Sequence, residues 1–420
     1  MNTGWQRVLG LSCIRLTGVV LQTVILLVVG RIAGPAGVGT LQLFLAWTCS
    51  LGELAAAGLP THAMRRMVQA DECRASALQY FAKATSRLAG VWLVLMLVAF
   101  VLYAFGWIQS GLHLGFVAVS VFCFALYRIA SESLKAVGQV DASVLVESAL
   151  PPVVAGTVIG TRYFLYGEIT SLDVIGAFSA GFFITAFVLV LRLLKYLGGM
   201  SNRRAAAPNI AWQEHAPYWV TALVSIGFLN YPFLVLPYFA TLAEIGSFAF
   251  AFKLLNLSTT ILLMLGAIYG PRFAKSALSG DKFGARRLLG QTQKLSLMLY
   301  VPMVVVLLVG YPFIHPLFGD GFGDALPILL VLAIGQLCGA MTGLSGQLLN
   351  MSGEGAKEMN IQLATLAIAI GLTPLAGNAF GAMGIAMVYS LTISLKSIAS
   401  LWTAYQLVGR DSPHFTKELV

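Results

Sequence analysis

Charged residues are scarce in this chain. Only 10% of its 420 residues are charged, 17 acidic and 26 basic, while 58% are hydrophobic. Soluble domains carry about 25% charged residues, so this composition excludes an ordinary soluble fold and indicates a protein with many membrane spans. The 43 glycines agree with that class, because small residues let membrane helices pack closely. We therefore expect the lipid bilayer to be a partner of the chain.

Motifs for catalysis and metal binding are also missing. The chain has no GxxxxGK[ST] sequence, which excludes ATP hydrolysis through a P-loop of its own, and no HExxH motif. Its five cysteines include no CxxC pair, which argues against a zinc site or a disulfide framework. The acidic loop at residues 320–324 is interpreted as a turn and helix entry. We therefore expect no enzyme activity, no metal and no other cofactor.

Apolar segments long enough to cross a bilayer, at about 20 residues each, recur along the whole chain. The connections between them are too short to hold a folded domain. The linker at 195–216 divides the spans into two sets, so we expect an all-α integral membrane fold with two six-helix lobes, 1–205 and 206–420; the family resemblance described below implies that they surround a central cavity. The twelve predicted spans are 9–30, 40–62, 84–106, 111–130, 144–166, 172–194, 217–239, 243–268, 295–315, 325–349, 359–377 and 382–407.

The two halves show weak internal similarity. Residues 28–67 align with 235–274 at an offset of 207, which places Gly39 opposite Gly246. Residues 134–139 align with 349–354 at an offset of 215. Because each half has six spans, both halves enter the membrane from the same side. The pattern predicts a parallel duplication with a pseudo-two-fold axis along the membrane normal.

Basic residues gather on one side of the predicted membrane topology. Of the 26 lysines and arginines, 21 lie on that side, in the connections, in the terminal segments or near the ends of the spans, so the positive-inside rule places both termini in the cytoplasm. The net charge of +9 then belongs to cytoplasmic loops, and nucleic acid is not an expected partner. One of these basic connections, 272–291, is expected to be a helix at the membrane interface or a solvated linker.

Three cations lie near the middle of predicted spans, where a charge costs several kcal/mol unless it faces a cavity or a partner. Lys253 shares one helical face with Asn256 and Thr260. The other two cations are Arg15, on a face with Gln22, and Lys396. We interpret these residues as candidates for substrate binding, and Gln336 as a further hydrogen-bond donor. Gln347 is a donor of the same kind, and for both glutamines hydrogen bonding between helices is the alternative.

Glu53 is the one acidic residue placed deep in a predicted span. It either pairs with Arg15, which lies at a similar depth in the first hairpin, or titrates as a coupling site for a proton or sodium ion. Arg128 and Glu147 are expected to anchor helices near the interface. Three cations against one anion leave a formal excess of two positive charges in the membrane interior, which favours an anionic substrate such as a diphosphate.

Several stretches resemble bacterial polysaccharide repeat-unit flippases, the O-antigen and exopolysaccharide type. They are Gly30–Gly39, Ala55–Leu59, Arg65-Arg66, Leu134–Gly138 and Pro316–Gly319. Those proteins belong to the multidrug/oligosaccharidyl-lipid/polysaccharide (MOP) exporter superfamily. The resemblance implies two six-helix lobes in the bacterial inner membrane. It also implies a cationic cavity, to which Arg15 corresponds.

The resemblance further implies transport of an undecaprenyl-diphosphate-linked oligosaccharide from the cytoplasmic to the periplasmic leaflet, with a polysaccharide polymerase and chain-length machinery as partners. The alternative of the same fold is a cation-coupled multidrug antiporter, which favours acidic residues at mid-membrane. A membrane polymerase or ligase is a further alternative, against which the short outward loops argue. A non-transporting scaffold of the same fold also stays open.

Overall fold

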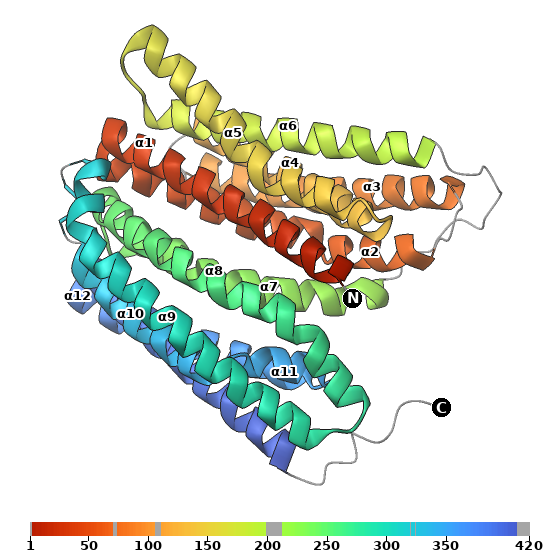
Figure 1. Ribbon diagram of the computed structural model, residues 1–420. Helices are drawn as coiled ribbons and strands as arrows, with labels where there is room; N and C mark the ends of the chain where they lie inside the picture. Colours follow the sequence, from red (N-terminus) through yellow and green to blue (C-terminus); the bar gives the residue numbers. More distant parts are fainter. Residues whose placement is uncertain are drawn as a thin grey trace. The chain divides into compact units, whose positions relative to one another are not determined.

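The computed structural model describes residues 2–69, 74–105, 111–198, 212–319, 321–323 and 325–409. Throughout these ranges the regular elements are helices, as predicted (Figure 1). Nine of these helices are long and apolar enough to cross a membrane, which confirms a multi-pass, all-α membrane fold. The elements are α1 (Asn2–Ala56), α2 (Leu59–Gln69), α3 (Arg74–Ala104), α4 (Gly111–Ala136), α5 (Val140–Tyr166), α6 (Ser171–Gly198), α7 (Trp212–Val235), the 3-10 helix η1 (Leu236–Tyr238), α8 (Leu242–Leu278), α9 (Lys282–Phe318), α10 (Ala325–Thr342), α11 (Ser345–Met351) and α12 (Gly355–Gly409).

Two of the helices are too long for one crossing. Both α1 and α12 contain 55 residues, about 82 Å at 1.5 Å per residue, against a hydrocarbon core of about 30 Å. Each consists of two arms that meet at a non-helical glycine, Gly34 (φ 64°) and Gly381 (φ 57°). With both arms counted, and with the 37-residue α8, the described part of the chain has twelve helical segments of spanning length.

The break in α1 falls inside the glycine-rich stretch Gly30–Gly39, between the predicted spans 9–30 and 40–62. Gly34 adopts φ 64° and ψ −171°, a conformation that residues with a Cβ rarely reach. Pro35 follows and begins the second arm; its missing N–H costs nothing in a first helical turn, where that donor has no helical partner. Glycine and proline therefore divide the two crossings at this point.

Two predicted spans are each interrupted by left-handed residues in the structure. The span 40–62 is interrupted by Ala57 (φ 50°) and Gly58 (φ 74°), so α1 ends at Ala56 and α2 starts at Leu59. The span 325–349 is divided at Gly343 (φ 64°) into α10 and the short α11. Apolar periodicity continues through both breaks, and this is why the sequence pattern does not reveal them.

The chain packs as two compact units. The N-terminal unit contains residues 9–33 and 40–230, and the C-terminal unit contains residues 1–8, 34–39 and 231–420. The division therefore falls within α7, between Asn230 and Tyr231, and the turn at 34–39 belongs to the C-terminal unit. The predicted boundary at residues 205 and 206 lies outside the described residues and stays a prediction.

The turns that follow α4 and α11 have the same geometry. Gly138 (φ 85°) and Gly353 (φ 80°) are both left-handed, and they are related by the predicted offset of 215. In each turn the residue after the glycine donates its backbone N–H to the carbonyl five residues earlier, at 2.9 and 3.0 Å. This shared helix ending supports the duplication inferred from the sequence.

A second structural match involves the offset of 207. A Cβ built at Gly39 would clash with the carbonyl oxygen of Leu242, and a Cβ built at Gly246 would clash with that of Pro35. At this offset residue 35 is equivalent to residue 242, and residue 39 to residue 246. The contact of Gly39 with Leu242 is therefore equivalent to the contact of Gly246 with Pro35. Such reciprocity is the signature of a two-fold relation between equivalent segments.

The basic segment 272–291 is largely helical and not a solvated linker, which corrects that expectation, while its place at the membrane interface stays a prediction. It contains the end of α8, a short turn and the start of α9. Phe273 and Leu289 are fully buried in an apolar cluster with Leu348 of α11 and Leu407 of α12. The apolar residues of this segment therefore pack within the C-terminal unit, although Phe283 is 79% exposed.

Candidate functional site

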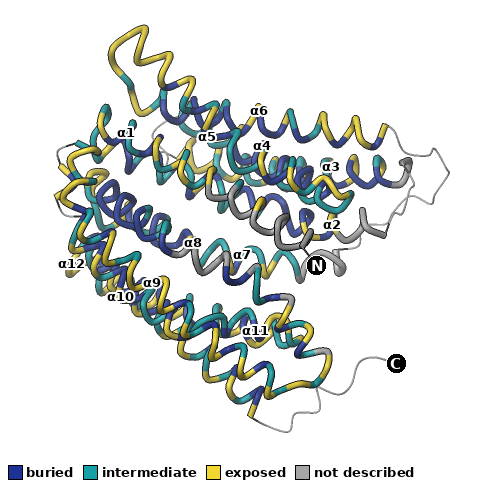
Figure 2. Tube along the Cα trace, viewed as in Figure 1, coloured by how far each residue is buried: buried dark blue, intermediate teal, exposed yellow. Residues whose placement is uncertain are grey.

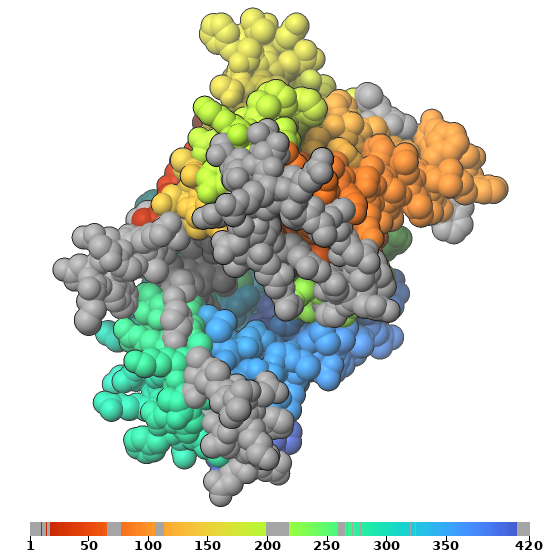
Figure 3. All heavy atoms as spheres, turned by 90° about the vertical axis from the view of Figure 1, so that its right-hand side faces the viewer, coloured from red at the N-terminus to blue at the C-terminus, as the bar shows by residue number. Residues whose placement is uncertain are grey.

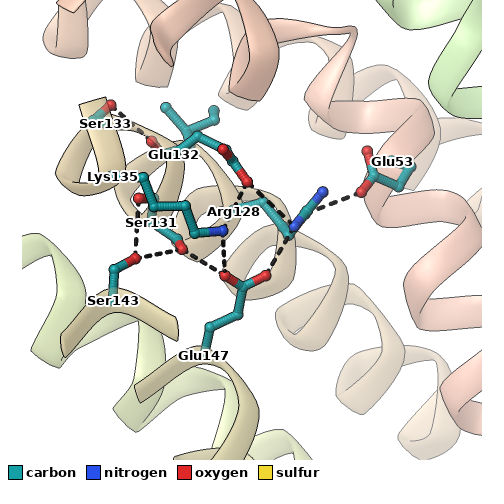
Figure 4. Close-up of polar contacts among 9 residues, drawn as sticks. Glu53, Arg128, Ser131, Glu132, Ser133, Lys135, Ser143 and Glu147 are labelled. Atoms are coloured by element: carbon teal, nitrogen blue, oxygen red, sulfur yellow. Dashed lines mark hydrogen bonds and ion pairs between the residues drawn. The ribbon is translucent and has the colours of Figure 1, made fainter. Parts of the chain in front are cut away.

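A network of ion pairs joins three helices of the N-terminal unit (Figure 4). Its centre is Arg128 on α4, whose Nε lies 3.1 Å from Oε1 of Glu53 on α1. Nη1 of Arg128 lies 2.8 Å from Oε1 of Glu147 on α5. Nζ of Lys135 lies 2.8 Å from Oε2 of Glu147 and 2.9 Å from Oε1 of Glu132. We call these five side chains the Arg128 network.

Hydroxyl groups complete the environment of Glu147. Ser131 donates to Oε2 of Glu147 at 2.6 Å and lies 2.7 Å from the hydroxyl of Ser143. Charged groups inside a bundle are tolerated when their hydrogen-bonding capacity is filled in this way. The network holds three carboxylates and two cations, so it carries a formal excess of one negative charge.

Arg128 and Glu147 thus have a role that the sequence analysis missed. They were expected as interface anchors, but they link α1, α4 and α5 through Glu53 and Lys135. A signal for this was present: Arg128, Ser131 and Lys135 recur at i, i+3 and i+7, the kind of polar stripe that singled out Lys253. The side chain of Arg15, the predicted partner of Glu53, lies outside the described residues.

The C-terminal unit has its own buried ion pair. Nζ of Lys396, on the second arm of α12, lies 3.3 Å from Oε1 of Glu358, which is 2% exposed on the first arm. Ser400 donates to Oε2 of Glu358 at 2.6 Å, and the side-chain amide of Gln362 donates to Oε1 at 3.2 Å. Lys396 is therefore a charge-compensated cation, and Glu358 is the partner that the sequence analysis did not identify.

Lys253 and Asn256 lie half-buried on α8, one helical turn apart. The same helix contributes Phe248 and Phe252 to an aromatic group of the C-terminal unit. Phe233 packs edge-on against both rings, and the Phe252 and Tyr389 rings lie 5.6 Å apart. Lys253 thus follows directly a residue of a packed aromatic layer. The side chain of Thr260, the third member of the predicted stripe, lies outside the described residues.

The glutamines differ in their surroundings. Gln347 of α11 donates to the carbonyl oxygen of Gly266 of α8 at 2.8 Å, which agrees with the interhelical interpretation. Gln336 is half-buried on α10 and Gln22 is exposed on α1. Gln22 belongs to the N-terminal unit, whereas Gln336, Lys253, Asn256 and Lys396 belong to the C-terminal unit. The predicted cavity that would unite them stays a prediction.

The charge count changes once the partners are known. The structure pairs Arg128 with Glu53 and Glu358 with Lys396, and it links Arg128 further to Lys135, Glu132 and Glu147. Their inclusion lowers the formal excess from two positive charges to one. Within the described ranges, no group of three or more His, Cys, Asp or Glu side chains is placed to hold a metal ion.

The chain is similar in fold to solved structures of multidrug transporters and of a lipid flippase. The chain is similar to an inward-facing multidrug resistance MATE family transporter of the MOP superfamily, with a TM-score of 0.72, 12% identity, and coverage of 95% of this chain and 98% of the other. It is also similar to the lipid II flippase MurJ in an inward closed conformation, with a TM-score of 0.69, 13% identity, and coverage of 94% and 86%.

A third similar structure is a MOP superfamily transporter from Pyrococcus furiosus, with a TM-score of 0.64, 14% identity, and coverage of 96% and 95%. For that protein, reverse polarity of the binding pocket is reported to suggest a different function. No protein-family model and no curated protein matches this chain by sequence. At these identities the similarity establishes the fold, which is that of MOP superfamily transporters.

Proposed function

We propose that the chain is a MOP superfamily transporter that flips an undecaprenyl-diphosphate-linked oligosaccharide repeat unit from the cytoplasmic to the periplasmic leaflet of a bacterial inner membrane. The product would feed surface polysaccharide synthesis. Transport would follow alternating access around a site near the bilayer midplane. The fold supports a transporter, since the similar structures include both a multidrug transporter and a lipid flippase.

The observation that carries the anionic substrate is the charge balance of the C-terminal unit. Among its described residues, Lys253 and Lys396 lie deep in spanning helices, and Glu358 is the carboxylate paired there. These described side chains place two ammonium groups and one carboxylate at depth. A site lined by more ammonium groups than carboxylates attracts an anion, and a lipid diphosphate is such an anion.

The proposal gives the predicted site residues separate roles. Lys253, with Lys396 and Arg15, would bind the diphosphate or acidic sugars through charge-assisted hydrogen bonds. Asn256, Gln336 and Gln22 would bind sugar hydroxyls. The prenyl chain would stay in the lipid phase, because its transfer into a polar cavity is unfavourable.

Glu53 is the proposed site for a driving ion, either a proton or sodium. Its carboxylate is 7% exposed and bound to Arg128, whose other partners are Glu147 and Glu132. Neutralising Glu53 would leave Arg128 with the two remaining carboxylates. An ion bound at Glu53 would therefore change which helices the guanidinium links, and this is the kind of two-state element that coupling requires.

A cation-coupled multidrug antiporter is the second candidate, and one observation favours it. The Arg128 network of the N-terminal unit carries more carboxylates than cations. A cationic drug would compensate that excess in the same way that a diphosphate compensates the C-terminal unit. The two candidates therefore differ in which unit supplies the principal substrate contacts.

The deciding experiment is mass spectrometry of lipid-linked intermediates in cells with and without the gene. A flippase predicts that one prenyl-diphosphate oligosaccharide accumulates on the cytoplasmic leaflet when the gene is absent, and its mass identifies the repeat unit. A drug antiporter predicts no such accumulation and a new sensitivity to cationic compounds. The second result would overturn the proposed function.

A further inference from the structure

A basic cleft of about 520 Å³ opens where three spanning helices of the N-terminal unit have their ends. It lies between the last turns of α4 and α6 and the first turn of α5. Its lining residues include Gln139, Ala142, Ser143, Arg192, Lys195 and Tyr196. The proposed transport mechanism uses none of these side chains.

The two cations of the cleft have no counter-charge within the described structure. Neither Arg192 nor Lys195 makes an ion pair or a side-chain hydrogen bond with any described residue. The nearby carboxylate of Glu147 is engaged by Arg128 and Lys135. Asp141, in the exposed first turn of α5, does not line the cleft. The cleft therefore has a local excess of two positive charges.

The polar groups around this pair suit a phosphate. The side-chain amide of Gln139 and the phenol of Tyr196 are exposed at the cleft and make no side-chain hydrogen bond with described residues. Gln139 precedes α5, and its side chain does not cap the helix, so the positive end of the α5 dipole adds to the same field. Gln139 and Tyr196 therefore provide an amide donor and a hydroxyl donor beside the two cations of the cleft.

The position of the cleft indicates a lipid rather than a soluble ligand. The 28 residues of α6 correspond to about 42 Å, longer than the ~30 Å hydrocarbon core, so its final turns reach the headgroup layer. Exposed positions recur along α6 (Figure 2). Among them are the apolar residues Phe187, 57% exposed, and Leu191, 48% exposed. Lys195 continues this i, i+4 series, and acyl chains can pack along the same face.

Figure 3 looks onto helix ends, and the C-terminal part of α6, in lime green, lies next to the yellow α4–α5 segment. Basic pockets between spanning helices at the membrane surface are a recurrent means of holding anionic headgroups. We propose that this cleft is a binding site for the phosphate headgroup of an anionic phospholipid, held by Arg192 and Lys195, and distinct from the transport site.

The test is lipid binding to the full-length protein by native mass spectrometry, comparing phosphatidylglycerol with phosphatidylcholine of the same acyl chains. The wild-type protein should bind phosphatidylglycerol more tightly. In the double variant Arg192→Ala/Lys195→Ala the affinity for phosphatidylglycerol should fall on the order of 30-fold, from about 1 kcal/mol per basic contact. The matched control Arg286→Ala/Lys294→Ala removes one exposed arginine and one exposed lysine of α9 outside this cleft and should keep the affinity.

A second variant tests the site in case the double variant does not fold. Gln139→Glu adds a carboxylate at the edge of the cleft without removing a cation, and it should weaken phosphatidylglycerol binding while phosphatidylcholine binding stays the same. Equal loss in the α9 control, or equal binding of the two phospholipids, would overturn the site. Binding of inorganic phosphate or undecaprenyl diphosphate in place of phosphatidylglycerol would overturn the assigned ligand. These readouts do not depend on which substrate the protein transports.

Discussion

Gly39 and Gly246 pack against each other's chain segments in a reciprocal contact. Space for a Cβ at Gly39 is taken by the carbonyl of Leu242, and space at Gly246 is taken by the carbonyl of Pro35. The two glycines are equivalent under the internal repeat, at an offset of 207 residues, so equivalent positions make equivalent contacts. Backbone approach this close is available only to glycine.

Gly246→Ala is therefore expected to destabilise the protein by about 1–3 kcal/mol or more, the range for overpacking a tight core. Backbone atoms, which cannot rotate away, occupy the space that the new methyl group needs. The measurement is thermal unfolding of the purified protein in detergent. Gly371→Ala is the control, since a Cβ there meets nothing within 4 Å and alanine favours helix by up to about 1 kcal/mol. Equal melting temperatures for the two variants would contradict the packing argument.

The Arg128 network should show strong coupling between its members. Arg128→Gln leaves the carboxylates of Glu53, Glu147 and Glu132 facing Lys135 alone, and we expect a loss of about 3 kcal/mol, the low end for a broken buried pair because Arg128 is 29% exposed. In the double variant with Glu53→Gln the loss should be smaller than the sum of the single losses. Strict additivity in unfolding measurements would mean that the pair contributes nothing.

The ion pair of α12 gives a second cycle. Glu358→Gln removes the charge that compensates Lys396, so stability should fall on the order of 3 kcal/mol. Adding Lys396→Met should restore most of this stability, because the uncompensated cation is then absent. The same two variants distinguish a structural role of Lys396 from a role in substrate binding. If the double variant is stable and still supports full glycan export, Lys396 is not a substrate contact.

Lys253→Ala should reduce surface glycan without lowering the amount of protein in the membrane. The side chain is half-buried on α8, and its loss removes the cation proposed to bind the diphosphate. Lys357→Ala is a suitable control, since that lysine is 53% exposed and pairs with Glu354 within one turn. Full glycan output from Lys253→Ala would remove the residue from the site.

Glu53→Gln should abolish the dependence of transport on the driving ion. The amide keeps the size of the side chain but neither titrates nor carries a negative charge. Transport into proteoliposomes is measured under a proton gradient and, separately, under a sodium gradient. If the variant responds to the same gradient as the wild type with the same pH dependence, Glu53 is not the coupling site.

The fold followed from composition and span length far better than the site followed from residue types. Twelve apolar segments and the turn at Gly34 were accessible, because both depend on local sequence. The ion-pair partners of the predicted charged residues could not be identified from the sequence. Glu358 is the fourth residue of α12, and it contacts Lys396 only because the two arms of α12 meet at Gly381. Arg128 and Glu53, 75 positions apart in sequence, likewise meet through helix packing that a single sequence does not encode locally.

The arrangement of the turn at 34–39 has a consequence for biogenesis. These six residues belong to the C-terminal unit, while the helical arms on either side belong to the N-terminal unit. During synthesis the turn therefore emerges about 200 residues before Leu242 and Gly246, its packing partners. Until α8 has been synthesised and inserted, the turn at 34–39 therefore lacks the backbone segment against which it packs in the complete chain. Separate expression of the two halves should consequently give an N-terminal fragment with an exposed carbonyl and glycine surface at this tip, which the complete chain never presents.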